Sequence, residues 1–159
     1  SFMDKATFIE AVRNGRAEWD ALLAQCDEDT LQRAPGPGAW SALEIIGHVS
    51  WSEREILAVM RDRTMAAGSP LWNLDQDERN AIVATETRAR TPRSVLDEAR
   101  QLSSQILTAA QQLSDEELND PAHFTGMPAD WLPWRIFAGC TFSHYPEHIP
   151  SLRALLTPS

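Results

Sequence analysis

Cysteine is scarce in this sequence: only Cys26 and Cys140 occur among its 159 residues. Two cysteines cannot form the disulfide framework that holds many small secreted domains together. Each cysteine also lies among apolar residues with helical spacing, where a free cysteine usually packs as a small hydrophobic side chain. We therefore interpret both as core residues and assign no thiol chemistry to either.

Long apolar runs are missing as well. No run approaches the ~20 residues that cross a bilayer, and the N-terminus lacks the basic start and apolar segment of a secretory signal. We expect a cytoplasmic protein that has no membrane partner. Ser1 and Phe2, which precede Met3, look like a remnant of recombinant expression. A 43% apolar composition suits one hydrophobic core, so we predict a single domain over residues 3–159.

Positive charge is in deficit. The chain has 14 Lys and Arg residues against 23 Asp and Glu residues, which gives a net charge of −9. Such a surface repels the phosphate backbone of nucleic acids and anionic lipid headgroups. We therefore expect no nucleic-acid partner.

The alternation of polar and apolar residues that is typical of strands is absent, and apolar residues instead recur every three or four positions. In the first segment, Phe8, Val12, Trp19 and Leu23 form one such stripe. This spacing predicts amphipathic helices. The helices are expected over residues 4–26, 41–67, 75–90, 91–113 and from 133 to the C-terminus.

The ends of these helices carry signals of their own. Ser41 and Glu44 form a capping box, and Thr91 followed by Pro92 is typical of a helix start. Proline and glycine between residues 35 and 38 predict a loop. Short helical turns are expected over 28–33 and 114–118, and a loop over 119–131.

These elements predict an all-α fold, a four-helix bundle. The connection from Gly68 to Pro92 is long, which implies at least one crossover decorated by an extra helix. Bundles of this kind build ligand and metal sites in their core from side chains on facing helices.

Two histidines, His144 and His148, lie four residues apart near the C-terminus. On a helix this spacing places both imidazoles on one face, where they can bind one ion. His48, at the edge of the buried stripe of the second long helix, can supply a third ligand. Three histidines leave one coordination position for water or substrate, as in catalytic zinc sites. The alternative is a set of hydrogen-bonded core or cleft histidines without metal.

Pro146 lies between the two C-terminal histidines and removes an amide from the helix. A kink there either preserves the stacking of the imidazoles or separates them, and the sequence leaves both outcomes open. Glu44, Glu55 or Glu147 can supply an acceptor for a ligating histidine or act as a general base. His123 lies in a loop, and we expect it to face solvent.

The chain has six tryptophans and a single tyrosine, Tyr145. Trp19 lies on a helix stripe and is interpreted as core. The others either cover one end of the bundle or form an aromatic pocket above the histidines, where the phenol of Tyr145 can donate a proton. The predicted pocket residues are Trp40, Trp51, Trp72, Trp131 and Trp134.

Several strings of the sequence are distinctive. The block Gly-Ala-Trp-Ser at residues 38–41 is followed by His48, Trp51 and the string Glu-Arg-Glu at 53–55. This block resembles the second helix of the DinB/YfiT-like four-helix-bundle proteins. The strings at residues 71–74, 77–80, 118–121, 131–134 and 144–149 resemble the ClbS/DfsB branch of that superfamily. The resemblance covers nearly the whole chain.

The resemblance implies a DinB-like bundle that has a long crossover, is often a homodimer, and in many members holds a divalent ion such as zinc, nickel or iron. One histidine of the second helix and two of the last helix are the implied ligands, which here are His48, His144 and His148. In the ClbS/DfsB branch the implied activity is protective hydrolysis of a strained cyclopropane in a genotoxic metabolite, without a clear need for metal. Other branches resemble transferases that use bacillithiol, mycothiol or glutathione.

Three hypotheses follow for the function. The first is a metal-assisted hydrolase or transferase that acts on a small molecule, with Glu55 or Glu147 as the base. The second is a ClbS-like protective hydrolase without metal, in which Tyr145, Glu55 and the tryptophans bind and protonate the strained ring. The third is a non-catalytic protein that sequesters a hydrophobic toxin in the aromatic cleft.

Overall fold

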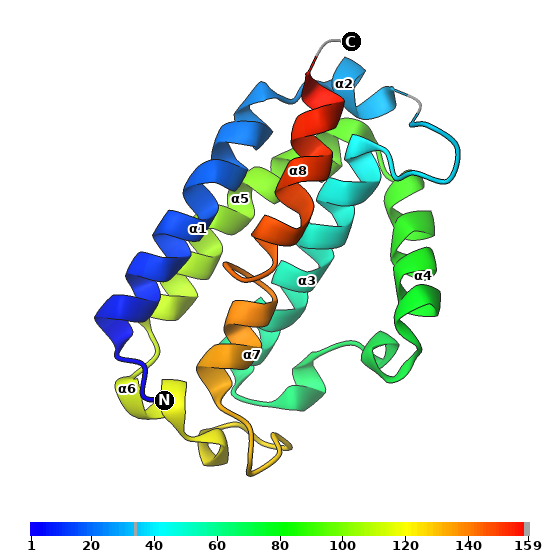
Figure 1. Cartoon of the computed structure of the whole chain (residues 1–159). Helices are drawn as coiled ribbons and strands as arrows, with labels where there is room; N and C mark the ends of the chain where they lie inside the picture. The colour runs from blue at the N-terminus through cyan, green and yellow to red at the C-terminus, as the bar shows by residue number, and fades with distance from the viewer. Residues whose placement is uncertain (34, 158–159) are drawn as a thin grey trace.

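Long helices dominate the structure, a computed structural model that describes residues 1–33 and 35–157. Three positions of a bundle are filled by α1 (Lys5–Gln25), α3 (Ala42–Asp62) and α5 (Pro92–Gln111), and the fourth is shared by α7 (Pro133–Gly139) and α8 (Tyr145–Leu156) (Figure 1). Within the described residues there are no strands, only one isolated bridge between Thr64 and Thr125. The predicted all-α bundle is confirmed.

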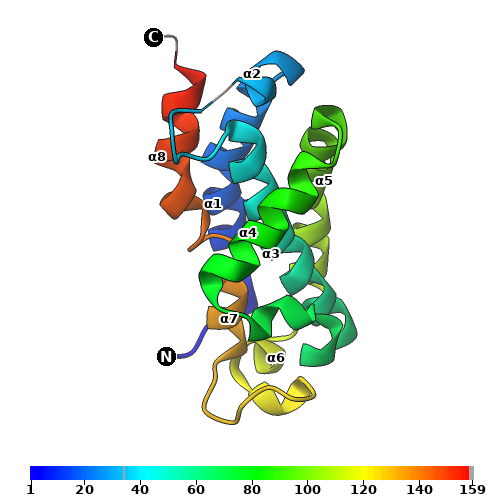
Figure 2. The same ribbon diagram turned by 90° about the vertical axis from the view of Figure 1, so that its right-hand side faces the viewer.

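Shorter helices connect and flank the bundle. The crossover between α3 and α5 includes α4 (Gln76–Arg88), which packs along the outside of α3 (Figures 1 and 2). This extra helix on a long crossover agrees with the prediction. The remaining short elements are α2 (Glu28–Gln32), α6 (Asp115–Asn119) and the 3-10 helices η1 (Met65–Ala67), η2 (Pro70–Asn73) and η3 (Pro121–His123).

The helix starts follow the capping chemistry of the sequence. The Ser41 hydroxyl accepts a bond from the Glu44 amide, and the Glu44 carboxylate accepts one from the Ser41 amide, so the predicted capping box is present. Thr91 caps α5 through the amide of Ser94. Each cap satisfies amides that have no partner within the first turn of a helix.

The second long helix ends at Asp62, five residues before the predicted end at residue 67. Arg63 adopts the left-handed conformation with φ 54°, which stops the helix. The chain then bonds to a distant loop: the Thr125 amide donates to the Arg63 carbonyl, and the Met65 amide donates to the Thr125 carbonyl, both at 2.9 Å. A pairing across this sequence distance is not visible in local periodicity.

The last helix is interrupted, whereas the sequence predicts one helix from residue 133 onward. The chain leaves the helix at Gly139 and resumes it at Tyr145, so that Pro146 lies in the first turn of α8. Proline has no amide and its ring clashes with the carbonyl four residues back, but a first turn tolerates it. The chain is therefore non-helical just before Pro146, and Pro146 does not kink a continuous helix.

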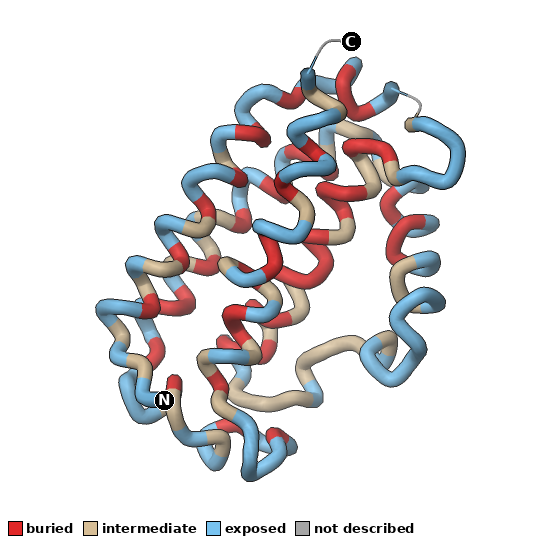
Figure 3. The backbone as a smooth tube through the Cα atoms, viewed as in Figure 1, coloured by how far each residue is buried: buried red, intermediate tan, exposed pale blue. Residues whose placement is uncertain are grey.

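The buried residues face the axis of the bundle along each long helix (Figure 3). Trp19 is fully buried, as predicted for a core residue. Cys26 is also buried, while Cys140 is half-buried. Burial raises the pKa of the Cys26 thiol to about 11 and that of the Cys140 thiol to about 12, so both are protonated at neutral pH.

No helix in the described part of the chain is both long and apolar enough to cross a membrane.

A buried polar cluster of Arg16, Glu53 and Tyr145 joins the helices at the centre of the bundle. Arg16 of α1 donates to the Glu53 carboxylate of α3 at 2.5 Å and to the Ala99 carbonyl of α5 at 2.9 Å. The Tyr145 hydroxyl of α8 donates to the same Glu53 oxygen at 2.8 Å. Burial raises the pKa of Glu53 to about 7, while Arg16 and Tyr145 act in the opposite direction. Hydrogen bonds of this cluster therefore reach all four positions of the bundle.

Replacing Glu53 tests this cluster. The variant Glu53→Ala removes the buried partner of Arg16 and leaves it the more exposed Asp20 at 2.7 Å, so we expect the free energy of unfolding to fall by about 3 kcal/mol. Urea unfolding followed by circular dichroism measures it. Arg93→Ala, which removes the exposed contact of Arg93 with Asp97 at 3.8 Å, is the control and should change stability little. A Glu53→Ala effect no larger than that of the control contradicts the prediction.

Candidate metal centre and cleft

Three histidines meet at one point between α3 and α8. The His144 Nε2 atom lies 3.2 Å from His48 Nε2 and 3.0 Å from His148 Nε2. His48 comes from the second turn of α3, His144 directly precedes α8 without a side-chain capping bond, and His148 lies in the first turn of α8. The structure therefore brings together the three residues that the sequence proposes as metal ligands.

With Pro146 in the first turn of α8, the rings of His144 and His148 stay in contact, edge to face at 89°, which is the outcome in which the proline does not separate them. The centroids of the two rings lie 4.6 Å apart. Because the interruption comes before the proline, both histidines keep the one-turn relation that places them on one face.

The spacing of the three nitrogens fits a small divalent ion. Two nitrogen ligands at ~2.0–2.1 Å from one zinc ion lie about 2.9 Å apart at a right angle and about 3.4 Å apart at the tetrahedral angle. The observed separations of 3.0 and 3.2 Å fall between these limits. Both separations from His144 Nε2 thus match nitrogens bound to one ion, and the ligand atoms of all three histidines lie within 4.8 Å of one another.

The protonation of the histidines also suits metal binding. Burial, and then the neighbouring imidazoles, lower the pKa of His48 to about 3, with a smaller effect of Arg79. Burial and His148 lower the pKa of His144 to about 4, and burial lowers that of His148. All three rings are therefore neutral at pH 7, which is the form that binds a metal.

No acceptor among the described residues orients the rings of His48 and His144, because both Nδ1 atoms are buried without a hydrogen-bond partner. Packing holds them instead. The Trp40 ring centroid lies 5.0 Å from that of His48, and the Trp40 ring is nearly parallel to that of His148, at 8°. The sequence proposes a glutamate as the acceptor, but Glu147 comes only within 4.0 Å of His144 Nε2.

A cleft of about 420 Å³ opens beside the three histidines. Its aromatic lining residues are Trp40, Trp51 and Trp72, three of the five tryptophans that the sequence places in a pocket. Trp51 and Trp72 pack against each other with ring centroids 4.7 Å apart. Glu147 lines the cleft too, which keeps it in reach as a base.

Trp131 and Trp134, which the sequence also places in the pocket, lie outside the cleft lining. Trp131 is 39% exposed in the loop before α7. The Trp134 indole donates to the Ser1 carbonyl at 3.2 Å and packs against the core cluster below the cleft. Both tryptophans stand at the start of α7, one end of the bundle, so they correspond to the alternative in which tryptophans cover a bundle end.

Tyr145 and Glu55 also lie outside the lining, because each is held by another contact. The Tyr145 side chain is fully buried and donates its hydroxyl to Glu53. The Glu55 carboxylate accepts bonds from the Ser69 amide and, at 2.9 Å, from the Trp72 indole. The tyrosine thus joins helices, and Glu55 orients one tryptophan wall.

One wall of the cleft comes from residues that the sequence analysis missed. Gln76, Arg79 and Asn80 of α4 line the cleft together with the histidines, and so does Arg135 of α7. The signal was present in the spacing: residues 76, 79, 80, 83 and 87 share one face of a helix, and Val83 and Thr87 on that face are buried. Because most residues on this face are polar, the spacing of apolar residues does not reveal it.

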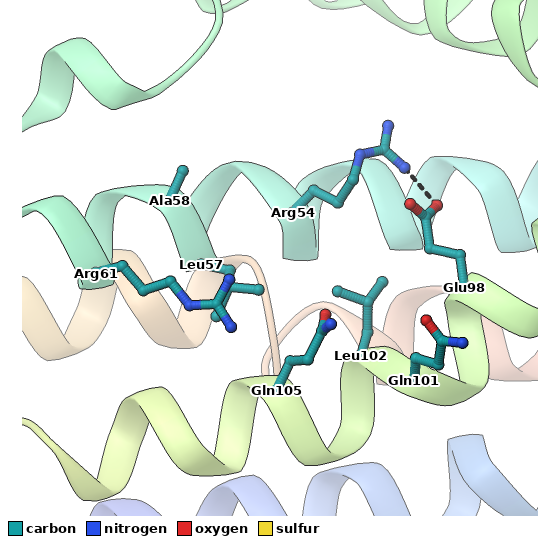
Figure 4. Close-up of a pocket in the computed structure, with 8 residues that line it drawn as sticks. All are labelled: Arg54, Leu57, Ala58, Arg61, Glu98, Gln101, Leu102 and Gln105. Atoms are coloured by element: carbon teal, nitrogen blue, oxygen red, sulfur yellow. Dashed lines mark hydrogen bonds and ion pairs between the residues drawn. The ribbon is translucent and has the colours of Figure 1, made fainter.

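A second hollow, of about 310 Å³, lies between α3 and α5 (Figure 4). Its lining has no histidine and no aromatic residue. Arg54 is held there by Glu98 at 2.5 Å. This groove therefore lacks the chemistry of the cleft.

The model of the DinB superfamily matches residues 11–149 of the chain. The matched span includes the three histidines and every residue that lines the cleft. A comparison with curated proteins gives no match.

The approach of α4 to α3 is close at Gly47, where an added Cβ would lie 2.3 Å from Thr87 Cγ2 and 2.9 Å from Thr87 Cβ. We expect Gly47→Ala to lower the thermal midpoint by about 2–8 °C, because overpacking outweighs the better helix propensity of alanine. Thermal unfolding followed by circular dichroism measures it. The control is Gly36→Ala, whose Cβ meets nothing within 4 Å. An unchanged or higher midpoint for Gly47→Ala means that α4 packs more loosely.

Proposed function

Because this chain belongs to the DinB superfamily, we propose that it is a metal-assisted enzyme that acts on a small molecule, as a hydrolase or a transferase. The proposed ligands of a divalent ion are His48, His144 and His148. The observation that carries the proposal is the convergence of their three Nε2 atoms, at 3.0 and 3.2 Å, beside a cleft of about 420 Å³. A cleft of this volume suits a small-molecule ligand.

When bound, zinc, nickel or iron supplies a Lewis acid that polarises an electrophile or activates water. The chain's own residues have separate tasks in the proposal. Glu147 lines the cleft with its carboxylate 4.0 Å from His144 Nε2, so it can accept a proton from a nucleophile held there. Trp40 covers His48 and His148 and keeps bulk water from that side of the rings.

We also propose the ClbS/DfsB branch as the finer assignment, on the strings that the sequence shares with it. A protective hydrolase of a strained electrophile would use the tryptophan walls to hold an apolar substrate. The metal-independent form of this hypothesis draws less support, because neither Tyr145 nor Glu55 lines the cleft and each already accepts or donates a bond within the protein, Tyr145 to Glu53 and Glu55 from Ser69 and Trp72. Sequestration without turnover and assembly as a homodimer remain proposals beside it.

Metal loading tests the proposal directly. Protein purified without an affinity tag should bind one equivalent of Zn²⁺ or Ni²⁺, and His48→Ala or His148→Ala should weaken binding by at least about 100-fold, because each removes a ligand. Isothermal titration calorimetry and elemental analysis after dialysis measure this.

His123→Ala is the matched control, since His123 is exposed at the end of η3, rather than in the loop that the sequence predicts, and lies outside the histidine cluster. Its binding should equal that of the wild type. Protein that holds no metal and cannot be loaded with Zn²⁺, Ni²⁺ or Fe²⁺ rules out the metal mechanism.

A chelation experiment separates the three functions. With an activated cyclopropane as substrate, we expect ring-opened product from the metal-loaded protein and loss of that product after treatment with a chelator. Product measured by liquid chromatography and mass spectrometry reports on this, and reloading of the ion is the control. Product that persists without metal favours the metal-independent hydrolase, and disappearance of one equivalent of electrophile without product favours sequestration.

A further inference from the structure

Two arginines, Arg79 of α4 and Arg135 of α7, line the cleft without an acidic partner. Within residues 1–33 and 35–157, neither forms an ion pair, whereas Arg54 binds Glu98 at 2.5 Å and Arg88 binds Glu44 at 3.0 Å. The chain has 23 acidic residues against 14 basic ones, so carboxylates are in ample supply. The N–H groups of the two cleft arginines are thus available to a ligand.

Both arginines are held by stacking rather than by charge. The Arg79 guanidinium carbon lies 4.7 Å from the ring centroid of Trp72, and that of Arg135 lies 5.2 Å from the ring centroid of Trp134. Stacking restricts the guanidinium but leaves the N–H groups at its edge unused. A guanidinium that is already oriented loses less conformational entropy when it binds a carboxylate.

The lining of the cleft has more basic than acidic side chains, whereas the whole chain has more acidic ones. Glu147 is the acidic residue of its lining, and it lies near His144 rather than in an ion pair with either arginine. Gln76 and Asn80 add neutral polar groups. The lining therefore has two arginines against one carboxylate, on a chain whose net charge is −9.

The remaining walls are flat and apolar. The Trp51 and Trp72 rings meet at 40° with centroids 4.7 Å apart, and Trp40 covers the histidines. Small-molecule sites commonly combine such walls with a few polar groups that fix the orientation of the ligand. Here the polar groups are guanidinium groups, which match a carboxylate in geometry.

We infer that the cleft binds a small carboxylate attached to a flat apolar group. Arg79 and Arg135 bind the carboxylate, and Trp51 and Trp72 contact the apolar part. The inference rests on the proposed function in placing the ligand beside the three histidines, but the arginine contacts do not require an ion.

The groove between α3 and α5 offers a matched comparison (Figure 4). Arg61 lines that groove and, within the described chain, also has no acidic partner. No aromatic ring lines the groove, so it has no flat apolar wall for the apolar part of the ligand. Arg61→Gln therefore removes the same charge from the protein without changing the cleft.

The experiment uses the full chain, freed of metal by a chelator, with 2-naphthoate and the neutral 2-naphthamide as probes in isothermal titration calorimetry. We expect 2-naphthoate to bind at least about 10-fold more tightly than the amide. Arg79→Gln and Arg135→Gln should each weaken naphthoate binding by about 10-fold and leave naphthamide binding unchanged. Arg61→Gln should match the wild type with both probes.

Equal affinity for the two probes, no measurable binding of 2-naphthoate, or the same loss in Arg61→Gln overturns the inference. The test is distinct from that of the proposed function. Arginine-dependent naphthoate binding in a protein that cannot be loaded with metal supports this inference and removes the metal mechanism. Metal binding without a preference for 2-naphthoate over 2-naphthamide supports the metal site and overturns this inference.

Discussion

The geometry of the histidines depends on a buried polar cluster directly beside them. Tyr145 follows His144, and its hydroxyl binds Glu53, which lies five residues after His48 on α3. The same two helices are therefore joined both at the site and in the core. A buried arginine and a buried carboxylate are costly unless their partners are in place, so the bond from Tyr145 to Glu53 favours this placement of α8 against α3. That placement brings the imidazoles together.

The interruption between α7 and α8 is the second condition for the site. An unbroken helix would have placed Pro146 in its interior, where the ring clashes with the carbonyl of Phe142. At the interruption α7 ends at Gly139 and α8 begins at Tyr145, with His144 directly before it. Gly15 of α1 makes room for it, since a Cβ there would lie 2.5 Å from Phe142 Cβ.

Much of the fold follows from local sequence signals, because capping boxes, prolines and apolar stripes act within a few residues. Ser41 and Thr91 begin helices where predicted, and the one-turn spacing of His144 and His148 identifies two members of the histidine cluster. The end of α3 is accompanied by backbone bonds to Thr125, and the position of α4 depends on its close approach to α3 at Gly47. Both are contacts between distant residues, so the local spacing of apolar residues does not predict them. Tyr145 and Glu53 are 92 residues apart in the sequence, so their contact could not be predicted locally. The tyrosine therefore lies in the core and not in the pocket where the sequence places it.

The packing of α4 has a consequence for how such a protein can diverge. The histidines and the polar cluster belong to the bundle, but three polar residues of the cleft lining, Gln76, Arg79 and Asn80, belong to a crossover helix with only a few buried residues. Residues 76, 79 and 80 can therefore be exchanged at little cost to the core, as loops of other folds are. In the proposed function, these α4 residues contribute to ligand binding while the metal ligands lie in the bundle, so a lineage can alter part of the ligand contacts and keep the histidines.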